Sequence, residues 1–527
     1  MTSQHSQRVA IIDLGSNTNR LVVLNTQEGY SYRLEDQVRE VVRLRHGMTA
    51  NGLSKEAFER GFSTLRLFKN FCDSTRVTKI FAIATSAVRD AANGPLFVQQ
   101  VREEIGLELR VLTGEQEAYY DTLGALNEVS LQRGVILDIG GGSIQLSEVR
   151  KRRFQQGVSL TLGTLALTEH FVTHDPVTKD EYVAIQEEIE RQLDTVKWLK
   201  KNEGEPLVGL GGTIRNLAQI QAENDDYPLY TLHGFVLERD SVEESVRLFR
   251  KLPVEERRDI PGLTPDRADI ILPGAMTLLE VMKRMDVEEI AISQNGVREG
   301  IFLEYFWEHL DPPILPDVRR FSVLNLARFY NYEKEHANHV RFLAECIFLQ
   351  LTPLHGYDAT VFELLDAAAL LHDIGRIIDY RGHHKHSQTL VENNGLPGFN
   401  PRELALIGLL TRFHRKGNPS IDGYEMLLDK DDLTLLTRLS AILRMAETLE
   451  RGRNANVNDV IATWDDDELR LTLITDSYPS VELWQAERNA APLMAAAFER
   501  NVRLDSFAPP IEHPKLPAEE EANDSEI

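Results

Sequence analysis

The sequence predicts two α/β lobes, followed by an all-α domain and a small α+β segment toward the C-terminal end of the 527 residues. Residues 11–23 and 136–148 repeat one pattern, in which an apolar strand leads into Asp-x-Gly, a small-polar turn and a second strand. Beyond residue 316, apolar residues recur with a helical period, and the connections are rich in histidine. A chain of this length is too long for one core, so several domains are expected.

The first lobe is predicted to span residues 1–130, where strand and helix patterns alternate. Three prolines within residues 311–316 resist helix and strand alike, and they mark the clearest boundary of the chain. A second lobe is therefore expected at 131–310. The first lobe's predicted helix is 54–73 and its strands are 8–14, 20–26, 30–45, 79–84 and 108–112; the second lobe has strands at 206–212 and 289–293 and a helix after Thr213.

The rest of the chain is divided by pattern into three parts. A helical domain is predicted at 317–455, and a hairpin followed by a helix at 456–512, with the hairpin strands at 460–464 and 469–474. The acidic segment 513–527 has few apolar residues, so it is predicted to be a disordered tail.

Composition is that of a soluble globular enzyme, with 42% hydrophobic and 27% charged residues. No apolar run approaches the ~20 residues of a membrane span, so no membrane partner is expected. Cys72 and Cys346 lack a ligand-like spacing, which favours a reducing, cytoplasmic location over a disulfide framework. The net charge of −24 argues against nucleic-acid binding. A polyanionic substrate would need a local basic path; residues 151–153 offer one, although a solvated turn also explains that triplet.

The repeated Asp-x-Gly pattern predicts a site for phosphoryl transfer. Small residues in a tight turn allow backbone amides to approach an anion closely. Asp13 and Asp138 each end a strand, and they can hold Mg²⁺ through its waters, because Mg²⁺ prefers a few carboxylates together with phosphate oxygens. Two facing phosphate loops with two carboxylates are typical of a phosphoryl-transfer cleft.

Further small-residue motifs fit the same cleft. Residues 209–217 follow a strand and open a helix at Gly211, Gly212 and Thr213, an arrangement suited to anion binding. Residues 293–300 also follow a strand, 85–90 supply Arg89, and 113–118 supply acids just before a helix. One glycine turn would be explained by local structure alone, but several in strand–turn context, two of them matched, favour a common anion site.

On these motifs, residues 8–310 resemble the exopolyphosphatase/guanosine pentaphosphate phosphohydrolase (Ppx/GppA) family. That family belongs to the actin-like ATPase and sugar-kinase superfamily, whose two lobes are duplicated ribonuclease-H-like units. Residues 317–510 resemble the HD-type extension of its longer members. The resemblance implies Mg²⁺-dependent hydrolysis of a terminal phosphoanhydride, on inorganic polyphosphate or pppGpp, by a homodimer.

The resemblance places the family's catalytic glutamate at Glu117, directly before Ala118. A carboxylate near two phosphate loops can orient and partly deprotonate an attacking water, although a charge at a helix N-terminus is also favoured by the helix dipole. Arg20 and Arg89 would balance charge on the phosphoryl oxygens. The family's phosphate motifs fall on Asp13, Gly15, Ser16, Asn17 and Arg20, and on Asp138, Gly140, Gly141, Gly142 and Ser143.

One departure from the family pattern concerns Gln145, where the family usually has Glu after the second glycine turn. Glutamine keeps the shape and hydrogen bonding but loses a negative charge, which weakens the binding of a hard cation. Lower activity, a changed metal preference or a specialisation for binding would each follow. Thr18 and Asn19 are a smaller departure, since relatives often carry Ser and an apolar residue there.

In the helical half, His372 and Asp373, with His336 on an earlier helix, resemble the HD metal phosphohydrolase superfamily. His386, His414 and Glu447 are the further candidate ligands. Imidazoles and carboxylates together suit Fe, Mn, Zn or Co. Because Glu447 replaces the usual Asp, a degenerate HD fold that binds substrate and builds the dimer is the main alternative.

The favoured function is thus a processive, Mg²⁺-dependent exopolyphosphatase, with pppGpp as a second substrate. A regulatory protein that binds polyphosphate or (p)ppGpp with weak or no hydrolysis is the alternative suggested by Gln145. An ATPase or sugar kinase is disfavoured, because Glu117 lies in the family's hydrolytic segment and no sugar-kinase motif is evident.

Overall fold

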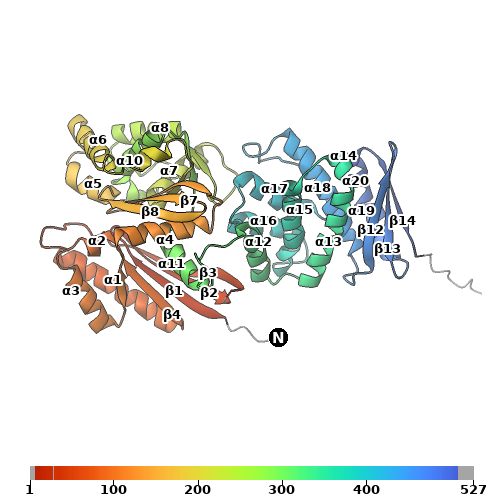
Figure 1. Cartoon of the computed structure of the whole chain (residues 1–527), viewed down its shortest axis with the longest axis horizontal. Helices are drawn as coiled ribbons and strands as arrows, with labels where there is room; N and C mark the ends of the chain where they lie inside the picture. Colours follow the sequence, from red (N-terminus) through yellow and green to blue (C-terminus); the bar gives the residue numbers. More distant parts are fainter. Residues whose placement is uncertain (1–5, 28, 509–527) are drawn as a thin grey trace, which may run out of the picture. The chain divides into compact units, whose positions relative to one another are not determined.

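The computed structural model describes residues 6–27 and 29–508, which form two compact units (Figure 1). The first unit holds the described residues up to 331 together with 389–405 and 422–428. The second unit holds 332–388, 406–421 and the described residues from 429 onward. The predicted tail at 513–527 lies outside the described residues.

The sheet of the first lobe has the strand order β3-β2-β1-β4-β5. Side chains of its central strand β1 point alternately to the two faces of the sheet, and both faces are apolar. Ala10, Ile12 and Leu14 join the core that includes α1 (Lys55–Ser74), and Val9 and Ile11 join the core that includes α11 (Val297–Phe306). Pairing is antiparallel in β1 (Gln7–Leu14), β2 (Thr18–Gln27) and β3 (Ser31–Val41), and parallel for β4 (Lys79–Ala84) and β5 (Leu109–Val111).

The sheet of the second lobe repeats this arrangement. Its order β8-β7-β6-β9-β11 matches β3-β2-β1-β4-β5, with β10 added at the edge. In both lobes three antiparallel strands are followed by two parallel ones, which is the duplicated arrangement of the actin-like ATPase fold and confirms the predicted fold class. The strands are β6 (Arg133–Ile139), β7 (Ile144–Arg150), β8 (Arg153–Leu160), β9 (Leu207–Leu210), β10 (Val236–Glu238) and β11 (Glu289–Ile292).

Two helices, α4 and α11, approach each other very closely. A Cβ atom at Gly300 would lie 2.0 Å from the carbonyl oxygen of Tyr120, so only glycine permits this packing.

The first unit contains α1 (Lys55–Ser74), α2 (Ser86–Arg89), α3 (Gly94–Gln100), α4 (Gly114–Leu126), α5 (Thr164–Phe171), α6 (Lys179–Leu193), α7 (Gly211–Asn224), α8 (Arg239–Lys251), α9 (Val254–Arg257), α10 (Ile271–Met285), α11 (Val297–Phe306) and α12 (Val318–Phe329).

The second unit is built on α13, α15 and α18, which pack on one another, and it carries a small sheet of order β12-β13-β14. The sequence predicted the hairpin but not β14, which pairs in parallel with β13. The elements are α13 (Lys334–Gln350), α14 (Thr352–His355), α15 (Ala359–Leu371), α16 (His383–Asn394), α17 (Pro401–Phe413), α18 (Lys430–Leu449), β12 (Val457–Trp464), β13 (Glu468–Thr475), α19 (Ser480–Asn489), α20 (Ala491–Phe498) and β14 (Asn501–Ser506); α16 and α17 have residues in both units.

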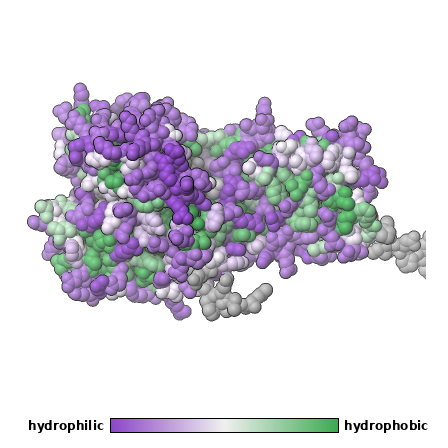
Figure 2. All heavy atoms as spheres, viewed as in Figure 1, coloured by the Kyte–Doolittle hydropathy of each residue, from purple (hydrophilic) through white to green (hydrophobic). Residues whose placement is uncertain are grey.

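Hydrophilic side chains cover most of the molecular face in Figure 2, with hydrophobic ones in scattered patches. Among the described helices, none is long and apolar enough to cross a membrane. Cys72 is buried, Cys346 is half-buried, and both are free.

Candidate active site and metal centre

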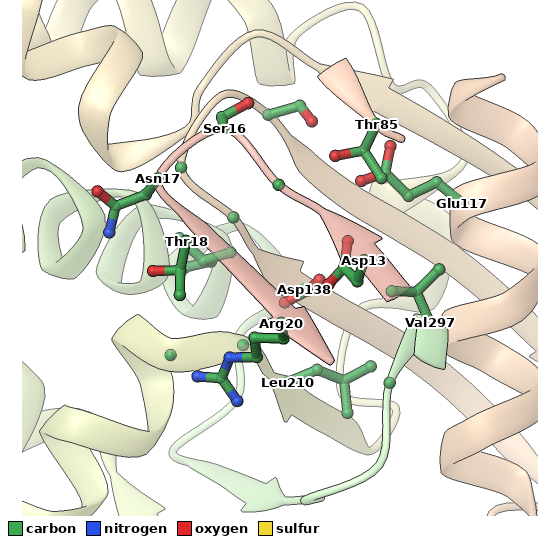
Figure 3. Close-up of a pocket in the computed structure, with 18 of the residues that line it drawn as sticks. Asp13, Ser16, Asn17, Thr18, Arg20, Thr85, Glu117, Asp138, Leu210 and Val297 are labelled. Carbon is green, nitrogen blue, oxygen red and sulfur yellow. The ribbon is translucent and has the colours of Figure 1, made fainter. Parts of the chain in front are cut away.

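A cleft in the first unit lies where β1, β6 and β9 end in glycine-containing turns and α11 begins. Figure 3 shows Asp13 and Asp138 extending into the same space between the two Asp-x-Gly turns. The lining residues include nearly all of the catalytic, metal-binding and phosphate-binding positions predicted for this cleft: Asp13, Gly15, Ser16, Asn17, Arg20, Glu117, Asp138, Gly140, Gly141, Gly142, Ser143, Gly211 and Gly212. Thr213 is buried one position further into α7.

Glycine is required where the turns meet. Gly211 adopts a φ of +87°, and a Cβ atom there would lie 2.2 Å from Oδ1 of Asp138. A Cβ at Gly142 would lie 2.4 Å from Oγ of Ser86 and 2.5 Å from Oγ of Ser16. Any larger residue would therefore push the two turns and Asp138 apart. The backbone of both lobes is left free to approach a ligand closely.

Four arginines line the cleft, namely Arg20, Arg215, Arg267 and Arg298. Burial and the other three arginines lower the pKa of Arg20 to about 9, and burial with Arg215 lowers that of Arg267 to about 10. This crowding of positive charge is unfavourable on its own and is relieved by an anion. Arg215 and Arg298 were not predicted as site residues, although each follows a glycine turn by one helical turn or less, which is a signal present in the sequence.

The basic triplet at 151–153 is a different kind of feature. The guanidinium of Arg152 donates to the carbonyl oxygens of Leu126 (2.9 Å) and Pro316 (3.2 Å), so it supports local backbone. The positive charge that faces the cleft comes instead from the four arginines of the lobes.

Glu117 lies on α4 at the wall of the cleft and is 7% exposed. Arg89 Nη1 donates to Glu117 Oε2 at 2.8 Å and to the carbonyl oxygen of Leu112 at 3.1 Å. Burial raises the pKa of Glu117 to about 7, although the Arg89 hydrogen bond and charge act in the opposite direction. Arg89 is not among the residues that line the cleft, and its guanidinium is held by Glu117 and by the backbone of Leu112.

Gln145 is 1% exposed and pairs across β6 and β7 with Asp138. Its Nε2 donates to Oγ of Ser143 at 2.8 Å and to Oγ of Ser159 at 3.1 Å. Its Oε1 is buried and makes no hydrogen bond with a described residue. The side chain thus supports the second Asp-x-Gly turn as a neutral donor.

The two motif aspartates fit a divalent cation. Oδ1 of Asp138 is buried without a hydrogen-bond partner among the described residues. Burial raises the pKa of Asp138 to about 6, and the Asp13 carboxylate adds to this rise while nearby arginines oppose it. Burial also raises the pKa of Asp13. Two mutually repelling carboxylates that face one cleft are a suitable ligand set for hydrated Mg²⁺.

A second cluster lies wholly in the second unit. Two groups of ligand atoms share Asp373: His336, His372 and Asp373 form one, and Asp373, His383 and His414 form the other, each with its atoms within 4.8 Å of one another. Glu447 joins the first group, because its Oε2 lies 3.1 Å from Nε2 of His336 and 3.3 Å from Nε2 of His372.

The backbone fixes the orientation of three of these imidazoles. Nδ1 of His372, His383 and His414 donates to a carbonyl oxygen of the same segment, at 2.7, 2.9 and 2.7 Å. Their Nε2 lone pairs therefore point into the cluster, where Nε2 of His383 lies 3.1 Å from Oδ1 of Asp373. Nε2 atoms that converge in this way, such as those of His383 and His414 at 3.3 Å, are stabilised by a proton or a metal cation between them.

The electrostatic field of the cluster also favours a cation. Burial alone would lower the pKa of His372, but Asp373 and Glu447 raise it to about 9. Burial, together with the neighbouring His372, lowers the pKa of His414 to about 3, so that imidazole is neutral as a metal ligand requires.

His386, which was predicted as a ligand, belongs to neither group. It lies with its Cβ beside Gly375, and His383 at the first position of α16 supplies the imidazole instead. The segment 383–386 contains three histidines, and the sequence alone does not show which of them faces the cluster, because this depends on where α16 begins.

Comparison with known proteins identifies the family. Residues 22–309 match the Ppx/GppA phosphatase family, and residues 318–489 match domain III of the same family. The chain belongs to the Ppx/GppA phosphatase family. This Ppx/GppA chain is similar to the crystal structure of the Aquifex aeolicus family member, at 28% identity and a TM-score of 0.50 over 58% of this chain and 99% of that one. An exopolyphosphatase from Cytophaga hutchinsonii shares the fold at 24% identity and a TM-score of 0.53, over 57% of this chain and 98% of that one.

Proposed function

We propose that this phosphatase-family member is a Mg²⁺-dependent exopolyphosphatase, which removes the terminal phosphate of inorganic polyphosphate and also converts pppGpp to ppGpp. The observation that carries the proposal is Glu117. Its carboxylate is buried, is held by Arg89, has a pKa near neutrality, and faces two phosphate turns and four arginines. A general base works best when its pKa lies near the operating pH.

In the proposed mechanism, the terminal phosphoryl group lies between the two glycine turns. Its oxygens accept hydrogen bonds from backbone amides of residues 141–143 and from Arg20, which also balances their charge, while the amide of Gly140 donates to the carbonyl oxygen of Ser143 and closes the turn. Mg²⁺ held by Asp13 and Asp138 supplies further positive charge to the phosphoryl oxygens when it is bound.

Glu117 orients a water molecule toward the terminal phosphorus and accepts one of its protons as the new P–O bond forms. The bridging P–O bond on the opposite side breaks, and its electron pair stays on the oxygen of the shortened chain, which arginines of the cleft can stabilise. The products are inorganic phosphate and a chain shorter by one phosphate. Glu117 then returns its proton to solvent.

Phosphate release from long-chain polyphosphate, pppGpp and ATP tests this proposal. Release from polyphosphate or pppGpp well above release from ATP supports it. Tight binding of these substrates without release supports instead a polyphosphate- or (p)ppGpp-binding regulator, the reading that the neutral Gln145 favours. ATP as the preferred substrate would contradict both.

For the second unit we infer a transition-metal centre that holds Fe, Mn, Co or Zn, because imidazole and carboxylate ligands suit these ions. The inward-facing Nε2 atoms of three backbone-anchored histidines carry this inference. Metal analysis of the purified protein tests it, and less than a tenth of an equivalent after metal-supplemented expression would show a vestigial site. A homodimer remains part of the proposal, and sedimentation measurements test it.

A further inference from the structure

One buried carboxylate near the cleft has no part in the mechanism above. Asp121 lies one helical turn after Glu117 on α4 and is 1% exposed. Neither of its carboxylate oxygens has a hydrogen-bond partner of normal geometry among the described residues. Oδ1 would lie 3.4 Å from a Cβ at Gly296, a residue that lines the cleft, so the carboxylate stands directly behind that wall.

The surroundings of Asp121 are unfavourable for an anion. Burial raises its pKa well above the usual value, and the carboxylates of Asp138, Glu117 and Asp13 raise it further. The backbone amide of Val297 provides only a partial compensation. The cleft arginines offset the charge of Asp13 and Asp138, but no arginine or lysine is among the main groups that act on Asp121. An uncompensated buried charge is strongly destabilising, so an ionised Asp121 requires a cation nearby.

We propose that Asp121 is a further carboxylate of the divalent-cation site in this cleft, where it accepts a hydrogen bond from a water on the ion. This inference rests on the proposed function, since it extends the Mg²⁺ site of Asp13 and Asp138. Asp121 lies behind the lining residues rather than among them, and Mg²⁺ keeps several of its waters in proteins, so contact through water fits both facts.

The role of Gln145 is consistent with this assignment. Its amide is committed as a donor to Ser143 and Ser159 and brings no negative charge to the site. Asp121 provides a charge from α4, on the same helix as Glu117, so one rigid element positions both carboxylates.

A purely structural role would be a cap for α11, whose first residue is Val297. The Asp121→Asn variant separates the two roles, because Asn caps helices about as well as Asp but carries no charge. A cap predicts no change in Mg²⁺ binding. A cation-site carboxylate predicts weaker Mg²⁺ binding, together with unchanged or higher stability in the absence of Mg²⁺, because repulsion among the carboxylates is relieved.

The test is a calorimetric titration of the full-length protein with Mg²⁺ in the presence of inorganic phosphate. We expect Asp121→Asn to raise the Mg²⁺ dissociation constant about tenfold, as loss of an outer partner of a metal typically does. Asp121→Ser, which also keeps a capping oxygen, provides a second variant. Glu115→Gln removes an exposed charge from the first turn of the same helix and should leave the titration unchanged.

Mg²⁺ binding by both Asp121 variants that equals the wild type would overturn the assignment. The readout needs no turnover. If the wild type releases no phosphate from polyphosphate or pppGpp, the proposed function fails, while the Mg²⁺ titration still decides the role of Asp121.

Discussion

The two candidate centres of this chain use different ligand chemistry. The cleft of the first unit combines carboxylates, arginines and bare glycine backbone, which suit a hard cation and a phosphate anion together. The cluster of the second unit combines imidazoles with carboxylates, which suit a borderline transition metal. In the cleft the shape of the glycine backbone determines which ligand fits, whereas in the histidine cluster the side-chain nitrogen atoms determine which metal fits. Different substitutions should therefore disable each centre.

The largest expected effect is that of Glu117→Gln. Loss of the general base should lower kcat by ~100-fold or more and leave substrate binding nearly unchanged, because the variant keeps the shape of the side chain. Steady-state rates and equilibrium binding of polyphosphate measure the two quantities, and Glu115→Gln is the matched control. Turnover close to that of the wild type would remove Glu117 from the mechanism.

In the second unit, His383→Ala should lower the bound transition metal about tenfold or more, because it removes an imidazole that faces Asp373. His386→Ala, three residues further along α16, should leave the metal content unchanged. Elemental analysis of both purified variants compares them directly. Equal losses in the two would mean that the structure has assigned the wrong histidine.

The pH dependence provides a further comparison. Glu117 acts as a base only when deprotonated, so kcat/KM should rise with pH and level off above a pKa of about 7. Arg89 favours the charged carboxylate, so Arg89→Gln should move this limb to higher pH. A pH profile of kcat/KM for both proteins decides this, and a shift to lower pH would contradict the role given to Arg89.

The smallest expected effect is that of Gln145→Glu. The added charge beside Asp138 should reduce the Mg²⁺ needed for half-maximal rate, and the hydroxyls of Ser143 and Ser159 can then donate to the carboxylate. A Mg²⁺ titration of the rate compares the variant with the wild type. An equal or higher Mg²⁺ requirement would indicate that the site is adapted to glutamine.

The sequence predicted the first site better than the second for a physical reason. Strand, turn and carboxylate follow one another within residues 11–23 and 136–148, so local chemistry and position are coupled. Arg267 enters the cleft region only through tertiary packing, which no local pattern records. The histidine cluster draws on separate helices, and the choice of His383 depends on the exact start of α16. Likewise, β14 pairs with β13 across an intervening pair of helices, so this pairing depends on how those helices pack.

The central claim is that phosphoanhydride hydrolysis takes place in the cleft of the first unit. The most direct test measures initial phosphate release from long-chain polyphosphate, with Mg²⁺ as the added metal, by the wild type, Glu117→Gln and Asp373→Asn. We expect Glu117→Gln to lose nearly all activity, whereas Asp373→Asn, altered only in the histidine cluster, keeps it. Loss of activity in Asp373→Asn with retention in Glu117→Gln would contradict the account and assign the reaction to the second unit.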